Sequence, residues 1–379
     1  MKSVSFGIFL LAAALMPRPA TSAAFLALDL PGSQLAALSA DGCVAAGGVL
    51  GARPSGFRWS AAHGAESLDA AITVHALSPS GDYAAGSTLD AMQREVASYW
   101  DGAGTLHRLA AMPGLATIGA VSQAHAITDA PHVVGSARRN DRLRIAFDWS
   151  DTTGMRALDP VRAEETRAIA ISPDGRRIGG WERIGDRVRP LHWRDGRLLA
   201  DASDTEPGEI LGASRDAETL VGWIAANGSY LVHRDAGIRR LGRDPPVRLR
   251  AGSDDGRVLA GERGSGDERE AWLWLQAEGF VSLRDWLARH AAALPPDWRP
   301  LALTAVSADG RRVGGWGRRD GDRLDSFIVD LGGASCDPAS HPQAAFRATA
   351  ADHARRQGHA ASPGPHPPAR PDLRPGSTR

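Results

Sequence analysis

The stretch AIAISPDGRRIGGWERIGDRVRPLHW, from Ala168 to Trp193, decides the fold because its skeleton recurs along most of the chain. Each copy has a small residue two places before a Ser or Thr, a turn rich in Asp and Gly, a short apolar run that ends in Gly, and a segment with aromatic residues. Such self-similarity predicts that one structural unit is used repeatedly.

The repeated Ser or Thr, which we term the anchor, sets the spacing of the copies. The anchors are Ser39, Ser78, Thr128, Ser172, Ser214, Ser253 and Ser307. A Gly follows each anchor after eight residues, or seven in the third copy: Gly47, Gly86, Gly135, Gly180, Gly222, Gly261 and Gly315. The anchors are 39 to 54 residues apart, which is near the spacing of four-stranded propeller blades.

Each copy contains the signals of four antiparallel strands. The first strand ends at the anchor, and an Asp-Gly pair such as Asp174-Gly175 makes a tight hairpin to the second strand. The short alternating runs favour strands over helices. The sequence therefore predicts an all-β fold, a seven-bladed β-propeller of four-stranded antiparallel blades. Six or eight blades would result if one of the irregular copies is misread.

The ends of the repeat region suggest how the ring closes. The seventh copy, Leu301 to Leu331, has three strands, whereas the run from Ala24 to Leu30 is a strand without a unit of its own. We expect this N-terminal strand to complete the last blade and close the ring, which removes exposed sheet edges. One segment, Leu283 to Trp298, has helical spacing and predicts a short helical insertion that ends at Pro295-Pro296.

The chain is predicted to have three parts. Residues 1–23 resemble a signal peptide, with an apolar core from Phe6 to Met16 and a small-residue cleavage site at Ala23. A retained membrane anchor is the alternative. Residues 24–333 form the predicted propeller domain, and residues 334–379 a Pro-, Arg- and His-rich tail that is expected to be disordered. The expected location is therefore the periplasm or the extracellular space.

The two cysteines, Cys43 and Cys336, fit an oxidising compartment. If the strands alternate in direction, each cysteine lies just past a strand end, on the same face of neighbouring blades. The sequence therefore predicts a disulfide bond that locks the ring, with a stabilisation of about 4 to 5 kcal/mol for so long a loop.

The repeat resembles the HAF repeat of bacterial extracellular proteins. The segment Ile145 to Trp149, IAFDW, is the nearest copy of the family motif, with Ile145 where the motif has His. Residues 283–331 resemble the C-terminal end of that family, and the resemblance covers roughly residues 25–331. It implies export and a propeller-like body, and it brings no catalytic residues to carry over.

Charge and motifs restrict the possible functions. The net charge is zero, with 44 basic and 44 acidic residues, so nothing favours binding to nucleic acid or to an anionic membrane. Metal-ligand spacing, a nucleophile elbow and a phosphate loop do not stand out. No cofactor or metal is therefore expected.

Five residues are candidates for binding. His75 and His125 each lie three residues before an anchor, on neighbouring innermost strands, where they suit a metal or a general base, or simple packing. Trp181, Trp223 and Trp316 follow the repeat Gly directly; exposed rings would stack on sugars, and buried rings would wedge between blades.

The leading functional prediction is an exported, non-catalytic, monomeric scaffold that binds a protein or glycan partner through its loops. The alternative is a propeller glycoside hydrolase or lyase that acts on extracellular carbohydrate. That chemistry needs two carboxylates about 5 to 10 Å apart, and Asp148, Glu182, Asp186 and Glu262 are acidic residues expected in loops.

Overall fold

The computed structural model describes residues 23–112, 121–138, 143–158, 164–199, 206–224, 228–233, 235–242, 246–332 and 336. All of them belong to one compact part of the chain, residues 1–342. The predicted signal peptide, apart from its last residue, and the predicted tail, apart from Cys336, lie outside the described residues.

Nearly all regular structure is β, in antiparallel sheets whose strands follow one another in sequence. The first sheet contains β2 (Ser33–Leu38), β3 (Val44–Val49), β4 (Ser55–Ser60) and β5 (Gly64–Leu68). The second contains β6 (Ala71–Leu77), β7 (Ala84–Leu89), β8 (Glu95–Trp100) and β9 (Leu106–Arg108).

The next sheet has nine strands and consists of two consecutive sets. The first set is β10 (Ser122–Ile127), β11 (His132–Arg138), β12 (Arg144–Ser150) and β13 (Gly154–Ala157). The second is β14 (Glu165–Ile171), β15 (Arg177–Ile184), β16 (Arg187–Arg194) and β17 (Arg197–Leu198), with β18 (Glu206–Pro207) also paired to β16. A single parallel pair, Arg144 opposite Glu165, joins the two sets.

Three further sheets follow. They are formed by β19 (Glu209–Ala213), β20 (Thr219–Ile224), β21 (Gly228–His233) and β22 (Gly237–Gly242); by β23 (Val247–Gly252), β24 (Val258–Arg263), β25 (Glu270–Leu275) and β26 (Gly279–Ser282); and by β27 (Trp298–Val306), β28 (Arg312–Arg319), β29 (Arg323–Asp330) and β1 (Ala24–Ala27). We term each four-stranded set a unit. The first strand of each unit, which we term the innermost strand, is β2, β6, β10, β14, β19, β23 or β27.

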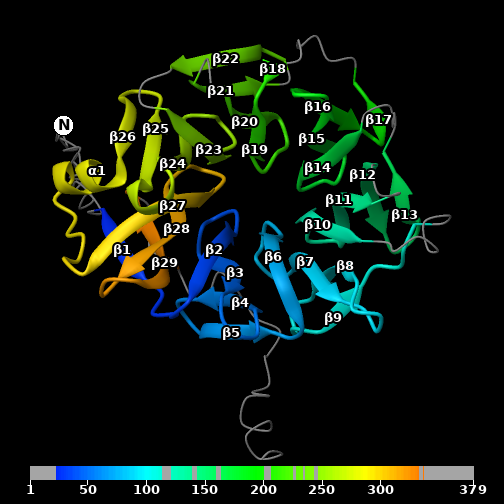
Figure 1. The fold of residues 1–379 in the computed structure, drawn as a ribbon, viewed down its shortest axis with the longest axis horizontal. Helices are drawn as coiled ribbons and strands as arrows, with labels where there is room; N and C mark the ends of the chain where they lie inside the picture. The colour runs from blue at the N-terminus through cyan, green and yellow to red at the C-terminus, as the bar shows by residue number, and fades with distance from the viewer. Residues whose placement is uncertain are drawn as a thin grey trace, which may run out of the picture. The chain divides into compact units, whose positions relative to one another are not determined.

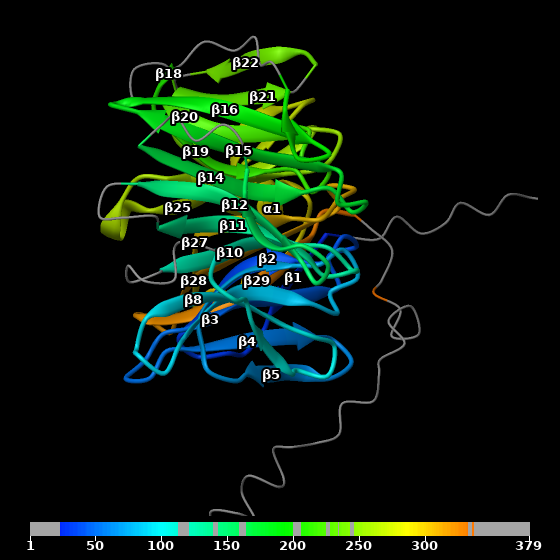
Figure 2. The same ribbon diagram turned by 90° about the vertical axis from the view of Figure 1, so that its right-hand side faces the viewer.

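The units are arranged around a common axis (Figure 1), and their strands run between the two faces of the ring (Figure 2). Each unit contacts the next along the chain, and β2 also packs against β28. The predicted all-β, propeller-like fold is confirmed. The strand β1 pairs antiparallel with β29, with Ala24 opposite Asp330, so the N-terminal run does join the last sheet as its fourth strand.

The repeat Gly is explained by a bulge in every innermost strand. The pairing register of each innermost strand shifts at or next to the residue opposite this Gly, for example between Leu249 and Ala251 opposite Gly261. The shift brings a main-chain carbonyl oxygen over the Gly. A Cβ atom at any of the seven repeat glycines would lie 2.0 to 2.2 Å from that oxygen. Only Gly can occupy the position without moving the backbone.

The anchors stabilise the turn that follows each innermost strand. The Ser253 hydroxyl donates to Asp255 (2.6 Å) and accepts from the Val258 amide (3.1 Å), while Gly256 takes a positive φ of 63°. Hydrogen bonds between units complete this end of the ring, which we term the anchor end. The Ala308 amide donates to the Ala40 carbonyl at 2.8 Å, joining the β27 unit to the β2 unit.

Cys43 and Cys336 form the predicted disulfide bond, across 293 residues of sequence. The predicted helix is shorter than expected. Helix α1 spans Leu283–Arg289 and buries Leu283, Trp286 and Leu287. It ends well before Pro295-Pro296, because Ala291 adopts a positive φ of 53° and the chain turns towards β27. A 3-10 turn, η1 (Gly266–Glu268), precedes β25. No helix among the described residues is long and apolar enough to cross a membrane.

Candidate functional site

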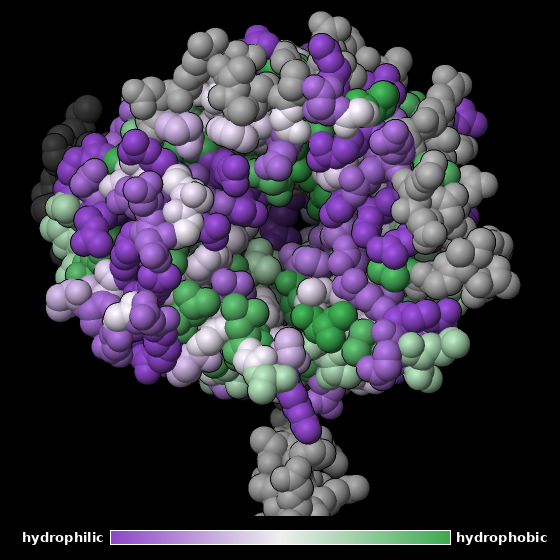
Figure 3. All heavy atoms as spheres, viewed as in Figure 1, coloured by the Kyte–Doolittle hydropathy of each residue, from purple (hydrophilic) through white to green (hydrophobic). Residues whose placement is uncertain are grey.

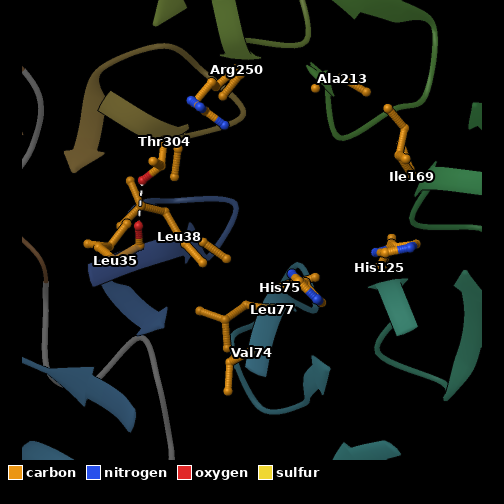
Figure 4. A pocket seen from close by; sticks show the side chains of 18 of the residues that line it. Leu35, Leu38, Val74, His75, Leu77, His125, Ile169, Ala213, Arg250 and Thr304 are labelled. Carbon is orange, nitrogen blue, oxygen red and sulfur yellow. Dashed lines mark hydrogen bonds between the residues drawn. The ribbon is translucent and has the colours of Figure 1, made fainter. Parts of the chain in front are cut away.

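A pocket of about 550 Å³ lies along the axis of the ring, lined by residues of every innermost strand. Figure 3 shows the hollow at the centre of the molecule, and Figure 4 shows the side chains that surround it. We term it the axial pocket. Much of its wall is aliphatic, with Val74, Leu77 and Ile169 among the lining residues. Polar groups therefore occur at a few defined places, as in typical small-molecule sites.

His75 and His125 lie side by side in this wall, with ring centroids 5.2 Å apart. Desolvation by burial lowers the pKa of His75 below its ordinary value, although the Glu95 carboxylate opposes the shift. Burial lowers the pKa of His125 further, helped by the neighbouring His75 ring and two arginines. Both imidazoles are therefore neutral near pH 7, so they are able to accept a proton.

The two histidines differ in their hydrogen bonds. His125 Nε2 lies 3.1 Å from the hydroxyl of Ser136 on β11, and Arg144 donates to that same hydroxyl at 3.3 Å. The Ser136 hydroxyl has two lone pairs and one proton, so it can accept from Arg144 and still either donate to or accept from His125 Nε2. These contacts hold the His125 ring in place in either tautomer. His75, by contrast, bonds to none of the described residues through its ring nitrogens, and its Nε2 is buried.

A polar network begins at Thr73, which lines the pocket, and extends to residues that do not line it themselves. Ser87 donates to Glu95 at 2.6 Å and lies 2.5 Å from the Thr73 hydroxyl. Gln123 Nε2 donates to the same Glu95 carboxylate at 2.9 Å. Because each group restrains the next, the side chains next to His75 and His125 are held in fixed orientations.

Arg250 lies on another side of the pocket, on β23 (Figure 4). Its guanidinium makes a two-point ion pair with Glu262, with nitrogen-oxygen distances of 2.5 and 2.6 Å. Glu262 is almost fully buried. This geometry is typical of arginine bound to a carboxylate, and it fixes a polar group in an otherwise aliphatic wall. Nearby, the Thr304 hydroxyl donates to the Leu35 carbonyl at 2.6 Å.

Arg215 crosses the pocket at the anchor end. It extends from the turn after β19 and donates to the Leu77 carbonyl on β6 at 3.3 Å; these strands lie on opposite sides of the ring (Figure 1). Burial lowers the pKa of Arg215 to about 10, opposed by Asp254, Asp129 and Asp41. The guanidinium thus remains charged at neutral pH and obstructs this end of the pocket.

The three candidate tryptophans lie in different surroundings. Trp316, on β28, lines the axial pocket. Trp181 is 7% exposed and packs among apolar residues of its own and the following unit. Trp223 lies beside Arg248 of the next unit, whose guanidinium is 4.8 Å from the ring centroid, and it is not among the pocket-lining residues.

Of the four acidic residues expected in loops, Asp186 does lie in one, the turn between β15 and β16. Asp148, Glu182 and Glu262 lie in strands β12, β15 and β24 of three different units, so their placement in loops was wrong. Each of these three has an arginine partner, as Glu182 has in Arg189. Among the described residues, no group of three or more His, Cys, Asp or Glu side chains is placed to hold a metal ion.

Sequence reasoning found the histidine pair and Trp316 and missed Arg250 and Arg215. Each is an arginine on or just after an innermost strand, where the other copies mostly carry small or apolar residues. A charged residue at a repeat position that faces the axis was the available signal.

Solved structures with a similar fold include the following three. Puromycin hydrolase is similar with a TM-score of 0.54 and 15% identity, over 82% of this chain and 55% of that one. A mutant of puromycin hydrolase complexed with PGG is similar with a TM-score of 0.53 and 16% identity, over 81% of this chain and 54% of that one. U3-55K is similar with a TM-score of 0.50 and 11% identity, over 81% of this chain and 98% of that one. No protein-family model and no curated protein sequence matches the chain.

These likenesses show a shared fold, and this chain spans about half the length of puromycin hydrolase. They also correct the leading functional prediction. The solved structures with this fold include a hydrolase, which contradicts the expected non-catalytic scaffold. The HAF-repeat resemblance remains a prediction, since no comparison tests it.

Proposed function

We propose that this protein is a hydrolase whose axial pocket binds a small-molecule substrate. The observation that carries the proposal is His75, a neutral imidazole in the pocket wall whose ring nitrogens bond to none of the described residues. A general base must be unprotonated at the working pH and have a free ring nitrogen within reach of water. Because Nε2 of His75 is buried, Nδ1 is the nitrogen that we assign to this role. The similarity to puromycin hydrolase supports the same reaction class.

In the proposed mechanism, His75 takes a proton from a water molecule as that water attacks the substrate. His125, held by Ser136, donates a hydrogen bond to the substrate in the tautomer that is protonated at Nδ1. Arg250, like Arg215, is a positively charged side chain of the pocket wall, and Glu262 fixes the orientation of Arg250. A fixed cation stabilises negative charge that develops in the transition state, because the surrounding groups need not reorganise. The aliphatic wall excludes bulk water from the reacting bond.

We further propose that the units form a seven-bladed propeller which β1 closes, and that the protein is exported. The pairing of β1 with β29 and the contact of β2 with β28 support closure. The disulfide bond supports an oxidising compartment.

The test is a hydrolysis assay on the full, disulfide-bonded protein. Amide, ester and glycoside substrates, including puromycin, are incubated with the wild type and with His75→Gln, and products are separated by chromatography. We expect cleavage of at least one substrate class and a loss of 100-fold or more in His75→Gln, a typical contribution of general-base catalysis. The control is His63→Gln, because His63 is exposed in a turn between β4 and β5.

Cleavage that survives in His75→Gln would refute the mechanism. An absence of cleavage across all three substrate classes would refute the proposed function.

A further inference from the structure

The residue that directly follows the repeat Gly differs from unit to unit. Its occupants are Gly48, Ser87, Ser136, Trp181, Trp223, Glu262 and Trp316. In the other units this side chain contacts a polar or charged neighbour, as Ser136 contacts His125 and Glu262 contacts Arg250. The β2 unit has no side chain at this position.

Gly48 leaves open space at this position. A Cβ atom there would meet a single atom within 4 Å, the Ser55 carbonyl oxygen at 3.9 Å. The adjacent Gly47 is different, since its Cβ would lie 2.1 Å from the Gln34 carbonyl oxygen. The fold therefore requires Gly47 and does not require Gly48.

The space beside Gly48 belongs to the axial pocket. Gly48, Leu50 and Gln34 line the pocket together with Trp316. Trp316 belongs to β28, which faces β2: a Cβ on Gly314 of β28 would lie 2.9 Å from the Leu35 side chain. Leu50 is 54% exposed, so this part of the pocket reaches the surface. The Arg269 guanidinium is 5.5 Å from the Trp316 ring centroid.

The chemistry of this part of the wall selects a ring-shaped ligand with few polar groups. It offers an indole, a leucine side chain and glycine backbone, with the Gln34 amide and the Arg269 guanidinium beside the indole as polar groups. A sugar would find few protein hydrogen-bond partners for its hydroxyl groups here, whereas an aromatic ring stacks on an indole with centroids 4.5 to 7 Å apart.

From this geometry we infer that the substrate carries an aromatic ring, which stacks on Trp316 in the space left by Gly48. The inference deepens the proposed function and rests on it, because it specifies the substrate class of the same pocket. Gly48 and Trp316 are specificity-determining residues, and they do not take part in the chemistry at His75.

The experiment measures binding, so that it is independent of turnover. Ligand-observed NMR titrations compare N-acetyl-phenylalaninamide with N-acetyl-cyclohexylalaninamide, which has a saturated ring of similar size, and with cellobiose. We expect the phenyl compound to bind about 2- to 12-fold more tightly than the cyclohexyl compound, and cellobiose to bind more weakly than either.

Two variants test the location. Trp316→Leu removes the stacking surface, and Gly48→Leu fills the space; each is expected to abolish the preference for the phenyl ring. Trp223→Leu is the matched control, because Trp223 occupies the same repeat position and also stacks with an arginine but does not line the pocket. Gly51→Leu controls for an added leucine, since a Cβ at Gly51 meets no atom within 4 Å. Circular dichroism checks that each variant is folded.

Equal binding of the two ring compounds, tighter binding of cellobiose, or no binding of any compound would overturn the inference. A preference that persists in folded Trp316→Leu and Gly48→Leu would overturn it as well. Binding with the expected preference but without any hydrolysis would leave the inference standing and remove the proposed function. Hydrolysis of substrates without any preference for an aromatic ring would support the proposed function and overturn the inference.

Discussion

Replacing Gly261 by Ala tests the physical explanation of the repeat. The added Cβ would lie 2.0 Å from the Arg248 carbonyl oxygen, 2.8 Å from the Arg248 carbonyl carbon and 2.9 Å from the Leu249 Cα. All three atoms are backbone, so no side chain can rotate away. To reach an ordinary contact, β23 and β24 must separate by more than about 1 Å, which strains the hydrogen bonds between them.

We expect this substitution to destabilise the protein by about 3 to 5 kcal/mol. Overpacking contributes about 1 to 3 kcal/mol, and two weakened ladder hydrogen bonds contribute about 1 kcal/mol each. The control is Gly48→Ala, where the nearest atom is 3.9 Å away; it should be neutral or stabilise by about 0.5 kcal/mol, because Ala loses less backbone entropy than Gly.

Both free energies are measured by guanidinium unfolding followed by tryptophan fluorescence, with the slope compared among variants. If Gly261→Ala changes stability by less than 1 kcal/mol, or if Gly48→Ala is the more damaging change, the bulge does not explain the repeat Gly.

Three other predictions follow from the same structure. Replacing Cys43 and Cys336 by Ser together should lower stability by roughly 5 kcal/mol, since the bond closes a loop across 293 residues; an unchanged unfolding midpoint would contradict this. The pKa values of His75 and His125 are lowered in the folded protein, whereas in the unfolded chain they have the ordinary value of 6.5. As the pH falls, the unfolded chain therefore takes up protons before the folded protein does. Stability should therefore be complete above pH 6.5 and fall as the pH drops through it, by up to about 1.4 kcal/mol per pH unit and histidine. A double replacement by Gln should flatten that slope. Arg215→Met should alter stability by less than about 1 kcal/mol, because the cost of burying the guanidinium offsets one long hydrogen bond; a loss above 3 kcal/mol would show stronger pairing.

The spacing of the repeat was enough to predict the sheets and the disulfide bond. Anchor, turn and Gly encode local geometry: Ser253, Asp255 and Gly256 close their turn with hydrogen bonds among residues 253–258. The end of α1 could not be predicted in this way. The positive φ at Ala291 depends on where β27 must begin, which is a property of the whole ring.

The pocket was harder to predict because the bulge interrupts the alternation of the innermost strands. In β6 the register shifts between Val74 and Ala76, and residues on both sides of the shift line the pocket, including His75. A period of two then no longer separates the residues that face the axis from those that face the next strand. The pairing of Arg250 with Glu262 depends on this register. Arg250 lies in the bulge, between Leu249 and Ala251, whereas Glu262 on the adjacent strand is opposite Arg248.

Comparing the copies with one another therefore says more about function than any single copy does. The repeat Gly is constant because a carbonyl oxygen occupies the place of its side chain, so it reports on the fold. The next residue is free of that constraint, and it varies from Gly48 through Ser136 to Glu262 and Trp316. Where it is serine or glutamate it orients a polar group of the axial pocket, and where it is absent it leaves room for a ligand. A constant frame with one variable position per unit is thus sufficient to give a symmetric ring an asymmetric pocket, which recognition of a small molecule requires.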